Sequence, residues 1–334
     1  MKPLDTLGRP LQALRISVTD RCNFRCGYCM PREAFGPDHP FLAREALLSF
    51  EEITRLARIF TGLGVAKVRL TGGEPLLRRE LPLLVKMLAG VPGLEDLALT
   101  TNGVLLPEQA ASLRAAGLRR LTVSLDTLRQ DRFQTLSDTD LSLSRVLAGL
   151  EAARTAGFTA LKLNCVLQRG VNEDEILELA AFAREEGHTL RFIEFMDVGT
   201  TNGWRLASVV PAAEVHQLLN ARWPLEPLSP GPGSVAQQWR YRDGRGEVGL
   251  IASVTEPFCR GCDRARLSAD GHLYTCLFAG EGLDLKAFLR AGHADADLAA
   301  LLAAQWKRRG DRYSELRRAD TPGLPKIEMS HIGG

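Results

Sequence analysis

Stretches in which hydrophobic and polar residues alternate recur along the first 200 residues, and each is followed by hydrophobic residues at helical spacing. Six strand–helix units in series favour an α/β fold with a parallel sheet and right-handed crossovers. Because a closed barrel of this kind needs eight units, we predict an incomplete (β/α)6 TIM-type barrel. The predicted strands lie near residues 13–19, 66–71, 96–101, 119–126, 160–167 and 189–196.

Several segments between these strands carry signals for the first turn of a helix. Ser49 and Glu52 have the spacing of a capping box, in which two side chains satisfy backbone N–H groups that the helix leaves free. Pro107 suits a first turn because proline lacks an N–H that would be unpaired there. Asn172, followed by Glu175, predicts the start of a further helix.

The predicted strands are not uniformly apolar, as strands covered on both faces of a parallel sheet would be. Aliphatic residues occupy one face of most strands and polar residues the other, because successive side chains point to opposite faces. We expect the aliphatic face to pack on the helices and the polar face to line a hydrophilic interior. Arg15, Arg69 and Lys162 fall on the polar face, which indicates an anionic ligand. The alternative is that each charge lies at an edge or on the surface.

The strand–helix rhythm stops near residue 200, where we divide the chain into domains 1–200 and 201–334. A loop rich in proline and glycine follows. Residues 235–253 and 264–276 each have the pattern of a β-hairpin around an Asp-Gly turn. Helical periodicity returns at 283–291 and 295–308. We therefore predict a smaller C-terminal region of antiparallel strands and helices.

Three cysteines follow the first predicted strand in the pattern C-x3-C-x2-C: Cys22, Cys26 and Cys29. Thiolates suit zinc or iron–sulfur clusters. A [4Fe–4S] cluster takes four thiolates when the protein ligates it fully, so three local cysteines would leave one iron open for catalysis. The alternative is a structural zinc ion with a distant fourth ligand.

A second trio, Cys259, Cys262 and Cys276, has the pattern C-x2-C-x13-C. It fits a structural zinc ion with His272 as the fourth ligand, or a second cluster held by three cysteines. Three arginines surround this trio, which indicates either phosphate binding or a solvated basic face. They are Arg260, Arg264 and Arg266.

Composition limits the remaining possibilities. The chain has 334 residues, with 42 Lys and Arg against 40 Asp and Glu, and this net charge of +2 gives no reason to expect a nucleic-acid partner. No apolar run is long enough to cross a bilayer, and no secretory segment opens the chain. Six of the seven cysteines lie in the two trios and favour metal ligation in a reducing cytoplasm. The seventh, Cys165, lies in an apolar strand, where we expect it to be a core residue.

Two segments together resemble a known superfamily. Residues 15–31, with Tyr28 directly before the third cysteine, resemble the cluster loop of radical S-adenosylmethionine (SAM) enzymes, and Thr71–Pro75 resembles their Gly-Gly-Glu stretch. Taken alone, the second segment is an ordinary strand-to-helix turn. The resemblance implies that the open iron chelates SAM and that reduction of SAM yields a 5′-deoxyadenosyl radical.

The resemblance narrows further when other segments are included. Essentially the whole chain is similar to the family of radical SAM enzymes that cyclise GTP in the first step of molybdenum-cofactor biosynthesis. This similarity implies two [4Fe–4S] clusters and the product (8S)-3′,8-cyclo-7,8-dihydroguanosine 5′-triphosphate. It is carried by Arg15–Pro31, Arg69–Pro75, Thr100–Gly103, Ser124–Asp126, Phe258–Phe278 and Gly333-Gly334.

The family's residue roles transfer to matching positions of this chain as expectations. The catalytic ligands of the first cluster would be Cys22, Cys26 and Cys29, and those of the second Cys259, Cys262 and Cys276. Contacts to SAM would come from Tyr28, Gly73, Ser124 and Met196. Contacts to GTP would come from Arg15, Arg69, Thr100, Lys162, Arg264, Ala265 and Arg266. Asp263 adds a negative charge beside the last group, and Gly333-Gly334 would reach into the active site.

Two alternatives remain from the residues themselves. A peptide-modifying radical SAM enzyme could use the second trio for an auxiliary cluster, although more cysteines are usual in the C-terminal region of such enzymes. A non-enzymatic protein could bind two zinc ions. An enzyme of either radical type requires an electron donor, and we consider a homodimer as its assembly.

Overall fold

The computed structural model describes residues 2–333 except 160, 230, 232 and 318–324. Twelve strands of the described residues form one sheet in the order β12-β11-β10-β1-β2-β3-β4-β5-β6-β9-β8-β7. The first six strands are β1 (Ala13–Ser17), β2 (Lys67–Thr71), β3 (Asp96–Thr101), β4 (Arg120–Ser124), β5 (Lys162–Leu167) and β6 (Thr189–Glu194). The others are β7 (Leu225–Pro227), β8 (Gln237–Tyr241), β9 (Glu247–Ile251), β10 (Arg264–Leu267), β11 (His272–Tyr274) and β12 (Leu283–Asp284).

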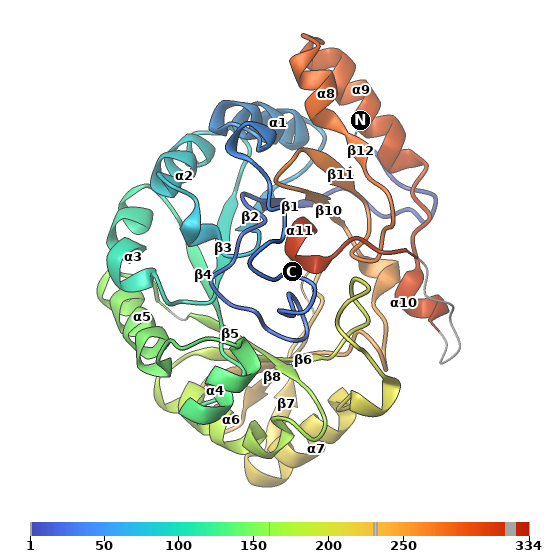
Figure 1. Ribbon diagram of the computed structural model, residues 1–334. Helices are drawn as coiled ribbons and strands as arrows, with labels where there is room; N and C mark the ends of the chain where they lie inside the picture. The colour runs from blue at the N-terminus through green and yellow to red at the C-terminus, as the bar shows by residue number, and fades with distance from the viewer. Residues whose placement is uncertain (1, 160, 230, 232, 318–324, 334) are drawn as a thin grey trace.

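Strands β1–β6 are parallel neighbours in chain order, which confirms the predicted six-unit partial barrel. Figure 1 shows the strands curved around a central space with helices outside them. The helices of this half are α1 (Phe50–Gly62), α2 (Leu81–Ala89), α3 (Leu106–Ala115), α4 (Gln130–Ser137), α5 (Leu143–Thr155) and α6 (Ile176–Glu185). The chain continues with α7 (Ala212–Arg222), α8 (Leu285–Arg290), α9 (Asp295–Lys307), α10 (Tyr313–Leu316) and α11 (Met329–Ile332).

Two strands of the C-terminal region extend this parallel sheet. Strand β10 pairs in parallel with β1, and β9 pairs in parallel with β6. Each also belongs to an antiparallel hairpin, β10–β11 and β8–β9, as the Asp-Gly patterns predicted. The sheet therefore has eight adjacent parallel strands but remains open, because β12 and β7 end it on opposite sides.

The hydrophobic core lies between the outer face of the sheet and the helices. Ile16, Leu70 and Leu99 are fully buried there, as the alternation of each strand predicted. Helix α1 begins with the predicted capping box between Ser49 and Glu52, and Pro107 lies in the first turn of α3. This packing leaves the opposite, polar face of the strands toward the central space.

The predicted helix start after Asn172 is confirmed, because a short 3-10 helix (Glu173–Glu175) follows it and leads directly into α6. The Asn172 side chain makes no capping hydrogen bond to the helix that follows. Its amide instead donates to the carbonyl oxygens of Asp126 (2.9 Å) and Val166 (3.0 Å), so it joins the ends of β4 and β5.

No helix of the described residues is both long and apolar enough for a membrane span.

Candidate active site

A cavity of about 540 Å³ lies inside the curved sheet and brings the two cysteine trios together. All six cysteines contribute to its wall, although about 230 residues separate the first trio from the second. Polar and charged side chains of the parallel strands face this cavity, as the alternation predicted, and apolar side chains line the rest of its wall. The cavity is the space in which two metal centres could act on one ligand.

The loop after β1 carries the first trio. Cys29 N–H and Met30 N–H both donate to the Cys26 carbonyl, which closes a tight turn, and Cys22 Sγ accepts the Phe24 N–H at 3.4 Å. Burial raises the pKa of Cys22 to about 12 and also raises the pKa values of Cys26 and Cys29. A bound metal centre would compensate the negative charge that these buried cysteines carry as thiolates.

The second trio has a different electrostatic setting; Cys259 and Cys262 lie between β9 and β10, and Cys276 follows β11. Burial raises the pKa of Cys262, but the adjacent Arg264 and Arg309 outweigh it and bring the pKa to about 6. The pKa of Cys276 is raised by burial to about 11, and its Sγ accepts the Phe278 N–H at 3.5 Å. Hydrogen-bonded thiolates in a half-buried wall fit an iron–sulfur cluster. Among the described residues, no three His, Cys, Asp or Glu side chains are already arranged around a single-ion site.

A polar network supports the wall around the first trio. Tyr28 donates its hydroxyl to Asp126 Oδ2 at 2.8 Å, and Val166 N–H donates to Asp126 Oδ1 at 2.8 Å. Burial raises the pKa of Asp126 to about 6, although both donors oppose the shift. Gly73 belongs to the same wall, where a Cβ would collide with the backbone carbonyl of Arg21. This position therefore needs glycine for the close approach of two backbones.

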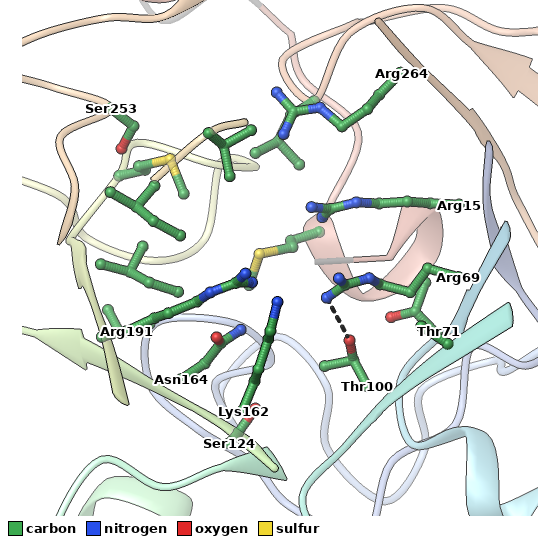
Figure 2. A pocket seen from close by; sticks show the side chains of 18 of the residues that line it. Arg15, Arg69, Thr71, Thr100, Ser124, Lys162, Asn164, Arg191, Ser253 and Arg264 are labelled. Atoms are coloured by element: carbon green, nitrogen blue, oxygen red, sulfur yellow. Dashed lines mark hydrogen bonds between the residues drawn. The ribbon is translucent and has the colours of Figure 1, made fainter. Parts of the chain in front are cut away.

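Cationic side chains from different strands converge on the cavity from opposite sides. Figure 2 shows Arg15 and Arg69 pointing toward Lys162 and Arg191, with Arg264 entering from another side. Arg15 lies between Arg69 and Arg266 in register, because β1 pairs with both β2 and β10. Arg69 Nη1 donates to Thr100 Oγ1 at 3.1 Å. The cluster is thus built by three adjacent parallel strands and faces β5 and β6.

Burial and mutual repulsion destabilise these positive charges. Burial first, and neighbouring arginines second, lower the pKa of Lys162 to about 8, that of Arg69 to about 9 and that of Arg191 to about 10. The Nε of Arg191 and Oδ1 of Asn164 are buried without a hydrogen-bond partner among the described residues. A polyanion with hydrogen-bonding groups would satisfy both the charges and these unpaired atoms.

The C-terminal segment also enters this region. In Figure 1, α11 lies over the central space, and the buried Arg266 donates to the carbonyl of Gly333. His331 Nε2 lies 3.2 Å from Asp270 Oδ1, which anchors the segment to the β10–β11 turn. A Cβ on Gly333 would collide with the Thr71 side chain, so a narrow entry requires glycine here. Gly334 lies outside the described residues.

The cavity is lined by all six cluster-ligating cysteines and by every residue expected to contact SAM or GTP except Ala265. Ala265 is buried on the opposite face of β10 from Arg264 and Arg266. His272 does not line the cavity, and its Nδ1 lies 3.1 Å from Asp270 Oδ2. Arg191 was missed, although the alternation along β6 places it opposite the buried Phe192.

Two sequence profiles match successive parts of the chain. The profile described as "Radical SAM superfamily" matches residues 16–183, and "Molybdenum Cofactor Synthesis C" matches residues 188–315. Among solved structures, Streptococcus suis SuiB bound to S-adenosylmethionine is similar in fold, with a TM-score of 0.61 at 16% identity. That similarity covers 90% of this chain and 66% of SuiB. The fold and the site together define a radical SAM enzyme.

Curated relatives match over nearly the full length. The GTP 3′,8-cyclase of Acidothermus cellulolyticus is 57% identical over 99% of this chain and 98% of its own. That of Xanthomonas campestris pv. campestris is 53% identical, with coverages of 99% and 97%. The Staphylococcus aureus protein of the same name is 44% identical, with coverages of 99% and 98%. The chain belongs to the GTP 3′,8-cyclase family.

Proposed function

We propose that this protein converts GTP to (8S)-3′,8-cyclo-7,8-dihydroguanosine 5′-triphosphate in molybdenum-cofactor biosynthesis. The observation that carries the proposal is the shared cavity, in which two cysteine trios and a cluster of buried cations face one another. A triphosphate supplies the negative charge that the cations lack, and a cavity of about 540 Å³ is of a size found for small-molecule sites.

Each part of the wall would have a separate task. Cys22, Cys26 and Cys29 would hold a [4Fe–4S] cluster that, with bound SAM, supplies the radical for hydrogen abstraction from C3′ of GTP. Tyr28, Gly73, Ser124 and Met196 would hold SAM beside it. The second trio would hold the other cluster beside the guanine.

The cations would position the nucleotide. Arg15, Arg69, Thr100, Lys162, Arg264 and Arg266 would bind GTP, with Arg191 as an additional contact. Guanidinium groups pair with phosphate oxygens through two parallel hydrogen bonds, so they fix orientation as well as charge. Holding the ribose near the radical source and away from water is the protein's contribution to rate and product. Residues 1–200 would carry the radical-generating half, and residues 201–334 the second cluster.

The cellular setting is part of the proposal. None of the seven cysteines forms a disulfide, which suits a reducing cytoplasm. Cleavage of SAM consumes an electron, so an external electron donor is required. Sedimentation of the cluster-loaded protein would test whether it forms a homodimer.

The test is anaerobic turnover with SAM, a chemical reductant and GTP, followed by mass analysis of the nucleotide. Cys22→Ser should abolish formation of 5′-deoxyadenosine, and Cys262→Ser should abolish the cyclised nucleotide. Cys165→Ser is the matched control, because this buried cysteine does not line the cavity. SAM cleavage without consumption of GTP would contradict the proposal and favour a peptide substrate. A colourless, zinc-loaded protein would favour the alternative of a non-enzymatic protein that binds two zinc ions.

A further inference from the structure

One buried arginine behind the cavity contacts the backbone and sulfur of the second trio. Arg309 follows α9, and its Nη2 donates to Cys262 Sγ at 3.2 Å, while its Nη1 donates to the Cys262 carbonyl at 2.7 Å. Its Nε donates to the carbonyl of Thr275, directly before Cys276, at 3.0 Å. A single planar guanidinium therefore fixes two of the three cysteine segments.

The charge of Arg309 is balanced from the other end of the chain. Asp5 Oδ2 accepts from Arg309 Nη1 at 3.0 Å and from Arg9 Nε at 2.6 Å. Arg9 Nη1 in turn donates to the Cys259 carbonyl at 2.7 Å. The side chains are 0% (Asp5), 1% (Arg309) and 3% (Arg9) exposed, so the network is sealed from solvent. Together, Arg9 and Arg309 hold all three cysteine segments.

Other charges near the trio do not replace this network. Asp311 Oδ2 lies 3.4 Å from Arg309 Nε but accepts the Thr275 hydroxyl at 2.6 Å. Arg264 donates to Cys262 Sγ at 3.4 Å, yet it also lines the cavity, where we place it on GTP. Arg309 does not line the cavity. A change at Arg309 therefore reaches the second trio without removing a cavity-lining side chain.

We propose that Asp5, Arg9 and Arg309 form a positioning network for the second cluster, and that Arg309 raises the reduction potential of that cluster through Cys262. The inference rests on the proposed role of Cys259, Cys262 and Cys276 as ligands. A donor on a ligand sulfur stabilises the reduced, more negative state of a cluster, and a fixed buried charge acts in the same direction. Outer contacts of this kind also orient the ligands and so strengthen metal binding.

The experiment measures the potential of the second cluster in the full-length chain whose first trio is replaced by serine, so that only one cluster gives a signal. Arg309→Gln should lower the reduced-to-oxidised ratio at a fixed potential by about tenfold, which is about 59 mV for one electron. It should also speed iron loss to a chelator by about 10- to 100-fold. Arg308→Gln is the matched control, because Arg308 is exposed and donates to Gln305.

A second variant separates tuning from mere support. Asp5→Asn removes the negative charge beside Arg309, so it should shift the potential in the opposite, positive direction, and it serves if Arg309→Gln fails to fold. Shifts of the same sign in both variants, or an unchanged potential and chelation rate in Arg309→Gln, would overturn the proposal. Retention of the second cluster in Cys262→Ser would instead refute the ligand assignment itself. Loss of the cluster in Cys262→Ser with a silent Arg309→Gln would refute only the present inference.

Discussion

The hydroxyl of Tyr28 donates a 2.8 Å hydrogen bond to Asp126, and this bond joins the first cysteine loop to the carboxyl end of β4. The two residues are 98 positions apart in the chain. Through this contact the loop that carries Cys26 and Cys29 is fastened to the rigid sheet. A site held by the sheet keeps its geometry better than one held by a loop alone.

Tyr28→Phe should weaken SAM binding by about tenfold, because a hydrogen bond to a charged group contributes about 1.5–3 kcal/mol. Burial raises the pKa of Asp126 to about 6 even though the Tyr28 hydroxyl opposes the shift. Loss of this hydroxyl should therefore move the acidic limb of the pH profile for SAM binding to higher pH. Calorimetric titration across pH would measure both effects. Tyr241→Phe, a buried position on β8, should change neither.

Lys162→Met should raise the free energy of unfolding of the ligand-free protein by about 1 kcal/mol, because it removes a charge that burial disfavours. This figure is reduced because solvent still reaches the ammonium. The folded-state pKa of Lys162 is about 8, against an ordinary value of 10.5. Between these values the unfolded chain binds more protons at this residue, so wild-type stability should rise with pH across the window.

The Lys162→Met variant should show less of this rise, and it should bind GTP about tenfold more weakly. Urea unfolding at several pH values and GTP titration would measure the two effects. Lys86→Met, on the exposed side of α2, controls for the loss of a surface charge. A variant that lost both stability and GTP affinity would show that Lys162 supports the fold rather than the ligand.

Arg191→Gln should weaken GTP binding by about 10- to 100-fold, because it removes a charge-assisted contact to phosphate. Retention of the [4Fe–4S] clusters should be unaffected, since Arg191 lies on β6, away from both cysteine loops in the chain. Iron analysis and GTP titration would check this. Arg240→Gln on β8, which is exposed, provides the control. Unchanged GTP affinity would remove Arg191 from the proposed site.

Gly333→Ala should reduce formation of the cyclised nucleotide by tenfold or more while leaving the unfolding midpoint unchanged. The residue has φ of +77°, and a Cβ would meet the Thr71 side chain inside the cavity. Gly292→Ala separates the two causes, because Gly292 has a similar φ of +80° but open space around it. Equal losses in both variants would attribute the effect to backbone strain alone. Product analysis by mass spectrometry would provide the measurement.

Local and periodic features of this chain could be predicted from sequence. The alternation in β1 and β2 placed Arg15 and Arg69 inside and Ile16 and Leu70 in the core, because pleating leaves little choice once one face is apolar. The α1 cap was predictable because both of its partners, Ser49 and Glu52, lie within one turn.

Long-range relationships could not be predicted in the same way. Strands β9 and β10 are short, and nothing local indicates that they join β6 and β1 in parallel. The helix after Asn172 was predictable, but the bonds of its side chain were not, because their partners Asp126 and Val166 lie at the ends of β4 and β5. The contact of Arg309 with Asp5 spans 304 positions, so no motif or spacing could reveal it.

The bond between Asp5 and Arg309 also has a consequence for biosynthesis. A ribosome delivers the chain from its first residue, so the loop of Cys22, Cys26 and Cys29 and its partner strand β4 emerge long before Arg309. The earlier trio could therefore receive iron on a nascent chain, whereas the later trio acquires its full support only after α9 has been synthesised. Maturation of the two centres would then be sequential, with the second cluster site completed last.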